Sequence, residues 1–243
     1  MSTLHENSTI RAVAVGRGVQ ANSEAGLATG AGRGPLAGSP VAWRVAAAVN
    51  AVVAAFALTV KFVEAATTAD PQFRTVASRV ANEACYFTIQ SNIIVVAVCV
   101  ALAWHRSSWH LVAGAPRLAG LVCITVTAVV YYALLASDEH FTGIAKVADV
   151  LAHFVSPLLF VGTWLFLGPR GQLRWRHVIE MLLFPLAWIA LTAVRGAITG
   201  VYPYDFVDVH ANGYPAVAVT VGALTAAAAL LAVAAVALDR YRA

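Results

Sequence analysis

The sequence predicts an all-α membrane protein, a bundle of six transmembrane helices that follows a disordered N-terminal tail. Hydrophobic residues make up 60% of the 243 residues and charged residues only 12%, and the mean hydropathy is +0.75. The apolar residues lie in long uninterrupted runs, without the period of about 2 or 3.6 residues that marks the half-buried strands and helices of soluble proteins. Such runs are typical of helices that are surrounded by lipid.

Residues 1–40 are predicted to be a disordered cytoplasmic tail, and residues 41–243 to form the six-helix transmembrane domain. The tail is rich in Gly, Ser, Ala and Arg and has few large apolar side chains, so it cannot bury enough surface to offset the entropy lost on folding. Its early apolar stretch, residues 12–15, is shorter than the roughly 7–15 residues that the core of a signal peptide needs. The tail is therefore expected to be retained.

Six apolar runs follow, each about long enough at ~1.5 Å per residue to cross a hydrocarbon core of about 30 Å. They are Trp43–Val63, Tyr86–Trp104, Arg117–Ala136, Val150–Leu167, Val178–Ile198 and Pro215–Leu238. The fourth run is short and is interrupted by His153, Ser156 and Pro157. Pro157 and Pro185 are expected to kink their helices, which a membrane tolerates where neighbouring groups satisfy the freed carbonyls.

The distribution of basic residues predicts the orientation. Arg residues lie in the tail, in the second and fourth connections and at the C-terminus, whereas the first, third and fifth connections are acidic by balance. Because cytoplasmic loops carry the excess of Lys and Arg, both termini are predicted to be cytoplasmic. Lys61 and Lys146 are the only lysines, and Ala and Val are abundant. This composition is typical of a high-GC bacterial genome, so the predicted location is a bacterial plasma membrane.

Several classes of partner and cofactor are not predicted. The net charge of +4 does not indicate nucleic-acid binding, because the basic residues alternate between spans and form no stripe. The three cysteines, Cys85, Cys99 and Cys123, have no spacing of a metal site or disulfide framework. The sequence has no phosphate loop, G-x-S-x-G, H-E-x-x-H or paired haem histidines. No cofactor or metal is therefore predicted; the expected partners are membrane lipids or a fatty-acyl substrate, and the oligomeric state stays open.

Polar residues gather at the ends of the predicted spans on one side of the bundle, the outer side in this orientation, and apart from Glu180 the ionisable residues at membrane depth lie there. They are Lys61 and Glu64 at the end of the first helix, Thr88, Gln90, Ser91 and Asn92 at the start of the second, Asp149, His153 and Ser156 at the start of the fourth, and Arg195 and Thr199 at the end of the fifth. Polar groups at membrane depth usually face the bundle interior or a cavity, so a shared outer pocket is predicted. Structural explanations exist as well, since Thr and Ser often bond a preceding carbonyl and Lys and Arg often snorkel.

Helical spacing indicates which of these polar residues lie close together in the predicted pocket. Thr88, Ser91 and Asn92 share one helix face, and Asp149 lies one turn before His153. A carboxylate beside an imidazole fixes its tautomer and raises its basicity, as the third member of a nucleophile–base–orienter set does.

At these residues the sequence resembles the androgen-induced protein family of six-helix membrane proteins, whose characterised animal members hydrolyse fatty-acid esters of hydroxy fatty acids with a Thr nucleophile and a His. The matching segments are Lys61-x-x-Glu64, the segment 86–89 (Y-F-T-I, like the family's F-L-T-F), His153 with residues 157–160 (like H-x-x-x-L-P-F), and residues 199–203 (T-G-V-Y-P, like T-G-x-x-V-Y-P). The resemblance implies that Thr88 is the nucleophile and His153 the catalytic histidine.

The leading hypothesis is an intramembrane lipid ester hydrolase with Thr88, His153 and Asp149 as catalytic residues. The expected substrate-binding residues are Lys61, Ser91, Asn92, Arg195 and Tyr202. Ser91 or Asn92 would donate to the oxyanion, and Lys61 and Arg195 would hold a free carboxylate. The alternative is a non-enzymatic binder or transporter of lipids or small molecules that uses the same pocket, although the internal repeats of many transporters are not evident. A structural or assembly protein would need only the helix-packing role of these polar groups.

Overall fold

The computed structural model describes residues 40–104, 114–137 and 141–243, and these ranges are helical apart from turns and short connections. Within these ranges, six helices are long and apolar enough to cross a membrane. The predicted fold class, an all-α bundle of six transmembrane helices, is confirmed, and the chain is a multi-pass integral membrane protein. The predicted disordered tail falls outside the described residues except for Pro40.

All the spans except the second are longer than hydropathy alone predicts. The spans are α2 (Pro40–Thr67), α4 (Phe87–Trp104), α6 with the π-helical turn η1 (Ala115–Val130, Tyr131–Leu135), the series α7, η2, α8 and η3 (Gly143–Val150, Leu151–Val155, Ser156–Gly162, Thr163–Leu167), α9 (Arg176–Thr199) and α10 (Val209–Tyr241). The fourth begins at Gly143, seven residues before the predicted start at Val150, because its first turns carry polar residues that a hydropathy boundary excludes. Pro185 lies inside α9, which continues through it.

Two short elements were not predicted. Helix α3 (Val76–Ala84) precedes the second span, and a 3-10 turn, η4 (Asp205–Val207), precedes the last. Thr75 and Ser78 form a capping box at the start of α3, each side chain accepting the other residue's backbone N–H; this satisfies two donors that a helix start leaves free. Helix α3 is too polar to register as a span, so hydropathy gave no signal for it.

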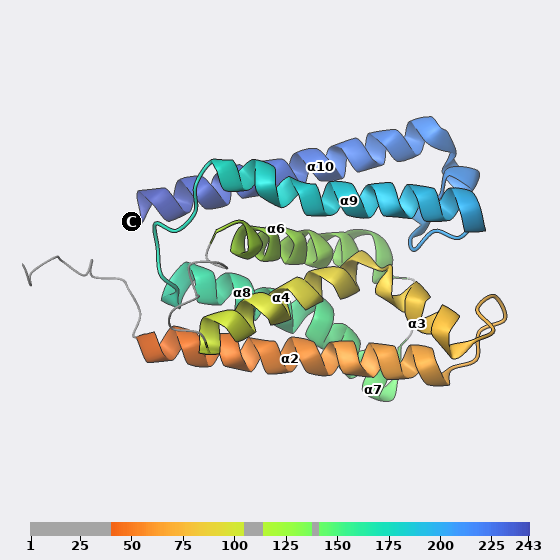
Figure 1. The fold of residues 1–243 in the computed structure, drawn as a ribbon, viewed down its shortest axis with the longest axis horizontal. Helices are drawn as coiled ribbons and strands as arrows, with labels where there is room; N and C mark the ends of the chain where they lie inside the picture. Colours follow the sequence, from red (N-terminus) through yellow and green to blue (C-terminus); the bar gives the residue numbers. More distant parts are fainter. Residues whose placement is uncertain (1–39, 105–113, 138–140) are drawn as a thin grey trace, which may run out of the picture. The chain divides into compact units, whose positions relative to one another are not determined.

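Within residues 40–243 the helices pack in a defined order. Helix α4 lies between α2 and α6, α6 also contacts α9, and α9 and α10 lie side by side (Figure 1). The fourth span packs against α2 and α6. The π-helical turn η2 of this span and the break between α3 and α4 lie at the same end of the bundle, where His153 meets Thr88, whereas the π-helical turn η3 ends the span at the other end.

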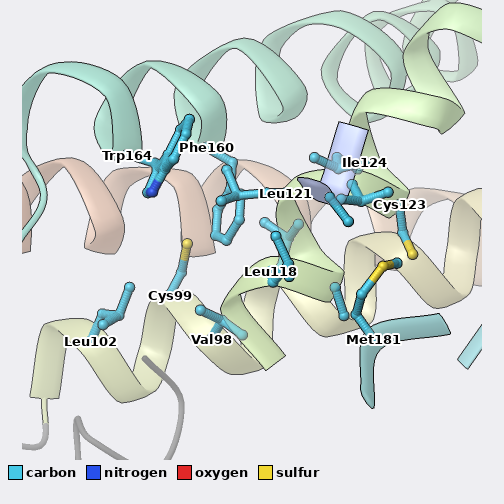
Figure 2. Packing of buried hydrophobic residues seen from close by; sticks show 14 of the residues in the cluster. Val98, Cys99, Leu102, Leu118, Leu121, Cys123, Ile124, Phe160, Trp164 and Met181 are labelled. Atoms are coloured by element: carbon cyan, nitrogen blue, oxygen red, sulfur yellow. The ribbon is translucent and has the colours of Figure 1, made fainter. Parts of the chain in front are cut away.

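All six spans contribute to the apolar core, and most of its large side chains come from α4, α6 and the fourth span. Figure 2 shows Val98 and Cys99 of α4 packed with Leu118 and Leu121 of α6, beside Phe160. Outward positions also carry large apolar side chains, with Val52 and Leu230 each 70% exposed and Ile198 78% exposed. An apolar exterior suits helices that face lipid.

Buried polar contacts hold the other end of the bundle, away from the start of α4. Arg117 is only 2% exposed and donates to the Pro169 carbonyl at 3.1 Å, and the Leu173 backbone N–H donates to Asp239 Oδ2 at 2.8 Å. In the sequence, Arg117 is the first residue of the third predicted span, next to the second connection. The structure buries it, where it holds the connection between the fourth and fifth spans.

Replacing Gly120 by valine is expected to destabilise the bundle by about 1–3 kcal/mol, the usual cost of overpacking. A Cβ atom at Gly120 would lie 3.0 Å from two ring atoms of Phe160, a contact between α6 and α8. Gly162→Val is the matched control, because a Cβ atom there meets nothing within 4 Å. Thermal unfolding of the purified protein in detergent should show a lower Tm for Gly120→Val alone, and equal Tm values for both variants would contradict the close packing.

Candidate functional site

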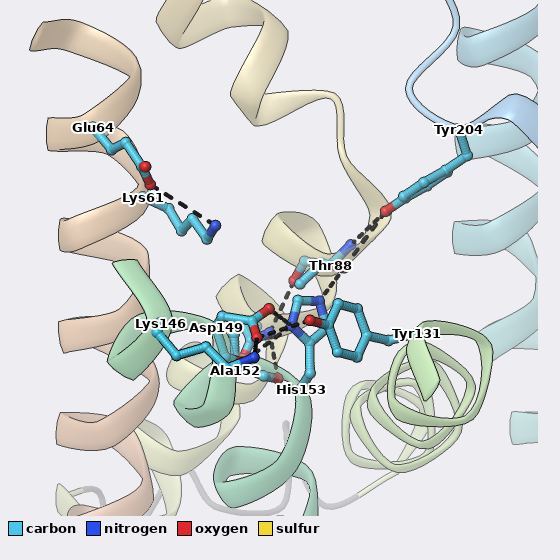
Figure 3. Close-up of polar contacts among 10 residues, drawn as sticks. Lys61, Glu64, Thr88, Tyr131, Lys146, Asp149, Ala152, His153 and Tyr204 are labelled. Carbon is cyan, nitrogen blue, oxygen red and sulfur yellow. Dashed lines mark hydrogen bonds and ion pairs between the residues drawn. The ribbon is translucent and has the colours of Figure 1, made fainter. Parts of the chain in front are cut away.

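A hydroxyl, an imidazole and a carboxylate lie in a hydrogen-bonded series at the start of α4 (Figure 3). Thr88 Oγ1 lies 3.2 Å from His153 Nε2, and His153 Nδ1 lies 2.9 Å from Asp149 Oδ1. Asp149 is 1% and His153 7% exposed, whereas Thr88 is half-buried. The structure therefore brings together the three residues that the sequence predicts to be catalytic, with the distances that proton transfer requires.

The surroundings of Asp149 define the imidazole tautomer. Asp149 Oδ2 accepts a hydrogen bond from the Tyr131 hydroxyl at 2.8 Å and from Lys146 Nζ at 3.1 Å, which leaves Oδ1 as the acceptor for His153. We assign the ring proton to Nδ1, which donates to Oδ1, because an ionised carboxylate can only accept. His153 Nε2 is then free to accept the Thr88 hydroxyl proton. The Tyr131 ring stacks on the imidazole at 3.7 Å between centroids and fixes the ring plane.

A π-helical turn positions His153. Pro157 has no N–H to donate to the carbonyl four residues earlier, so the regular hydrogen-bond ladder is interrupted at His153. In the wider turn of Leu151–Val155, the Ser156 N–H donates to the Leu151 carbonyl, which frees the carbonyl of Ala152. The Asn92 side-chain amide donates to that carbonyl at 3.4 Å. Turns of this kind are frequent at functional sites.

The break between α3 and α4 positions Thr88. Cys85 caps the end of α3, and its carbonyl accepts a hydrogen bond from Trp188 Nε1 of α9 at 2.8 Å. Phe87 packs edge-on against the same indole ring. Thr88 thus lies in the first turn of α4, where the unpaired N–H groups of a helix concentrate positive potential. Such potential favours negative charge that develops on a nearby oxygen.

Tyr204 is the nearest polar group on the other side of Thr88. Its hydroxyl accepts from the Thr88 backbone N–H at 3.3 Å and lies 3.5 Å from Thr88 Oγ1. Burial raises the pKa of the Tyr204 phenol to about 12, so at neutral pH it keeps its proton and can donate it in a hydrogen bond.

Neither Tyr131 nor Tyr204 was predicted from the sequence to belong to the site. Tyr131 gave a signal, because a phenol within a span needs a hydrogen-bond partner. Tyr204 stands just beyond the T-G-V-Y-P segment, and nothing in its sequence position distinguishes it from Tyr202.

Two cavities meet at Thr88. One is polar, with a volume of about 470 Å³, and its wall includes Thr88, His153 and Lys61. The other is a narrow apolar pocket of about 70 Å³ between α6, α9 and α10. Thr88, Tyr131, Leu135 and Tyr204 line both. Thr88 therefore lies in the wall of both a polar and an apolar cavity.

The predicted oxyanion donors do not reach these cavities. Ser91 donates to the Phe87 carbonyl and lies 2.8 Å from Thr127 Oγ1. Asn92 donates to the carbonyls of Thr88 and Ala152, and both side chains are fully buried. Their hydrogen-bond donors are used inside the bundle, so the structure gives them a packing role in place of the predicted contact with substrate.

The predicted carboxylate-binding pair is not assembled either. Lys61 lines the polar cavity, but its ammonium lies 3.9 Å from Glu64 Oε2 and 3.9 Å from the centre of the Phe141 ring. Arg195 donates to Asn82 Oδ1 and does not line the cavity. Tyr202, also predicted to bind substrate, lies outside both cavities, with its ring edge-on to that of His210. Helical position predicted that these residues lie at the correct end of the bundle, but not which way each side chain points.

The fold and the site define a class: a multi-pass integral membrane protein with a Thr–His–Asp series at one end of its bundle. In comparisons with known proteins, no family model, no curated protein and no solved structure matches the chain. The resemblance to the androgen-induced protein family stays a prediction from the sequence.

Proposed function

We propose that the protein is an intramembrane lipid ester hydrolase, a bacterial-type relative of the androgen-induced protein family. The observation that carries the proposal is the aligned series of Thr88, His153 and Asp149, with Thr88 Oγ1 at 3.2 Å from the imidazole nitrogen. A threonine hydroxyl is a weak nucleophile unless an adjacent base accepts its proton, and such a base must itself be oriented. Both conditions are met here.

The reaction follows from this geometry. Thr88 Oγ1 attacks the ester carbonyl carbon while His153 Nε2 accepts the hydroxyl proton, and the resulting imidazolium is stabilised by the carboxylate of Asp149. Collapse of the tetrahedral intermediate breaks the ester C–O bond, and His153 returns the proton to the leaving alcohol. Water, activated by the same imidazole, then attacks the acyl-threonine and releases the fatty acid and the Thr88 hydroxyl.

Removing the Tyr204 hydroxyl is expected to lower kcat by about 10–100-fold, somewhat less than loss of a dedicated oxyanion donor. In our proposal this phenol donates to the carbonyl oxygen as negative charge develops on it. Because that contact strengthens in the transition state, Tyr204→Phe should change kcat much more than KM. Tyr202→Phe is the matched control, and an equal effect of the two substitutions would assign Tyr204 a structural role.

The site is proposed to face the outer leaflet, with both termini in the cytoplasm. The connection that contains Arg174 is basic and the one that contains Asp205 is acidic, so the first should be cytoplasmic. Single cysteines introduced at these two positions, in a chain whose native cysteines are replaced, report the orientation in intact cells. A membrane-impermeant maleimide should label the cysteine at position 205 from outside and spare that at position 174, and the opposite pattern would reverse the orientation.

Ester hydrolysis by the purified protein tests the proposal. The protein in detergent micelles should release laurate from a lauroyl ester with saturation kinetics, well above the rate of heat-unfolded protein. The alternative function, binding or transport without chemistry, predicts that the ester binds saturably while no acid is released. That result would refute the hydrolase.

A further inference from the structure

The position of Thr88 between two unlike cavities limits which ester can reach it. The apolar pocket is lined by Val122, Val126 and Val130 of α6, Ile189 of α9, and Val221 and Leu224 of α10. It adjoins Thr88 directly and is much the smaller cavity, at about 70 Å³ against about 470 Å³. An ester carbonyl at Thr88 would therefore have an apolar pocket for the first carbons of an acyl chain on one side and a larger polar cavity for the alcohol on the other.

The polar cavity has more negative than positive side chains in its described wall. The ionisable carboxylates and cations there are Glu64, Asp70, Glu83, Asp205, Lys61 and Arg79. The positive groups are already occupied. Lys61 lies against Glu64 and the Phe141 ring, and Arg79 donates to the carbonyls of Ala65 and Ala66, each at 2.8 Å.

The raised pKa of Glu83 shows that the polar cavity disfavours a further negative charge. Burial raises the pKa of the Glu83 carboxyl, the nearby positive charge of Lys61 only partly offsets this, and Glu64 raises it further. A ligand carboxylate in the same space would meet the same desolvation and the same negative neighbours, without a cation of its own. A hydroxyl-bearing or cationic group would instead find carboxylate acceptors.

Accepting the proposed hydrolase function, we infer that the substrate is a single-chain acyl ester of a small polar alcohol without negative charge, with the first carbons of its acyl chain in the apolar pocket and its alcohol in the polar cavity. A monoacylglycerol represents this class. The inference departs from the esters of hydroxy fatty acids that the family resemblance implies, because those esters carry both a second long chain and a carboxylate.

Three lauroyl esters with the same acyl group test the inference: 1-lauroylglycerol, lauroyl lactate, which adds a carboxylate, and 12-lauroyloxystearate, which adds a carboxylate and a long second chain. We expect kcat/KM for lauroyl lactate to be at least about tenfold below that for 1-lauroylglycerol, and kcat/KM for 12-lauroyloxystearate to be lower still. Hydrolysis of either anionic ester as fast as 1-lauroylglycerol would overturn the inference while leaving the hydrolase intact.

Binding of the three esters to the Thr88→Ala protein tests the assignment of the cavities independently of the proposed hydrolase function. Calorimetric titration of this variant in detergent should show the highest affinity for 1-lauroylglycerol, a lower affinity for lauroyl lactate and the lowest for 12-lauroyloxystearate. If the order holds while the wild-type protein hydrolyses none of them, the cavity assignment stands and the hydrolase fails. If the anionic esters bind as tightly as 1-lauroylglycerol, the cavity assignment fails whatever the activity.

Two charge variants test whether the carboxylates of the polar cavity cause the expected preference for an uncharged ester. Glu83→Gln should narrow the ratio of kcat/KM between 1-lauroylglycerol and lauroyl lactate at least about threefold, and Asp205→Asn should narrow it in the same direction. Glu180→Gln is the control, because Glu180 pairs with Arg176 in the first turns of α9, at the other end of the bundle. An unchanged ratio in both cavity variants would overturn the electrostatic part of the inference.

Discussion

Thr88→Ala is expected to lower kcat for ester hydrolysis by about 10³-fold or more, because it removes the nucleophile from a set of residues that act together. The folded state should tolerate the substitution. Thr88 is only half-buried, and its backbone N–H, which donates to Tyr204, is retained. Turnover and Tm of the purified variant measure the two effects separately.

Two further variants sharpen this expectation. Thr88→Ser keeps the hydroxyl and should keep measurable turnover. Thr59→Ala removes a hydroxyl whose hydrogen bond goes to the Ala55 carbonyl of its own helix, and it should leave kcat unchanged. Wild-type turnover in Thr88→Ala would refute the nucleophile assignment.

Asp149→Asn is expected to lower kcat by about 10²–10⁴-fold while leaving KM nearly unchanged. The Tyr131 hydroxyl and Lys146 Nζ both donate to Oδ2, so an asparagine would keep its carbonyl oxygen there and turn its NH₂ group toward His153. The imidazole would then have to accept at Nδ1 and carry its proton on Nε2. In that tautomer it cannot accept the proton of Thr88.

Asp208→Asn is the matched control for this substitution. Asp208 caps α10, accepting from the backbone N–H groups of His210 and Ala211, and asparagine caps helices about as well. The control should therefore retain activity and Tm. If Asp149→Asn matched it in kcat, Asp149 would have no part in orienting the base.

Hydropathy predicted the number, order and approximate limits of the spans, because lipid requires about 20 apolar residues in each crossing. Hydropathy predicted the ends of the spans less well. The first turns of the fourth span, from Gly143, and the polar helix α3 depend on capping and tertiary contacts, such as the donation from Arg79 to the last carbonyls of α2.

The sequence could predict the contacts of the site that join residues of the same helix. Asp149 and His153 lie one turn apart, so their contact follows from local geometry, while the pairing of Thr88 with His153 came from resemblance. The rotation of each helix about its axis is set by packing with its neighbours. Spacing along one chain segment therefore could not show that Ser91 and Asn92 bond within the bundle, or that Arg195 is held by Asn82.

Covalent labelling of Thr88 tests the central claim, that His153 and Asp149 activate this hydroxyl. The purified protein is treated with a long-chain fluorophosphonate, which modifies activated hydroxyl nucleophiles, and the modified residue is located by mass spectrometry of peptides. We expect the adduct on Thr88, no labelling of Thr88→Ala, and much slower labelling of Asp149→Asn. An adduct on another residue, or labelling of Thr88→Ala at the wild-type rate, would contradict the account.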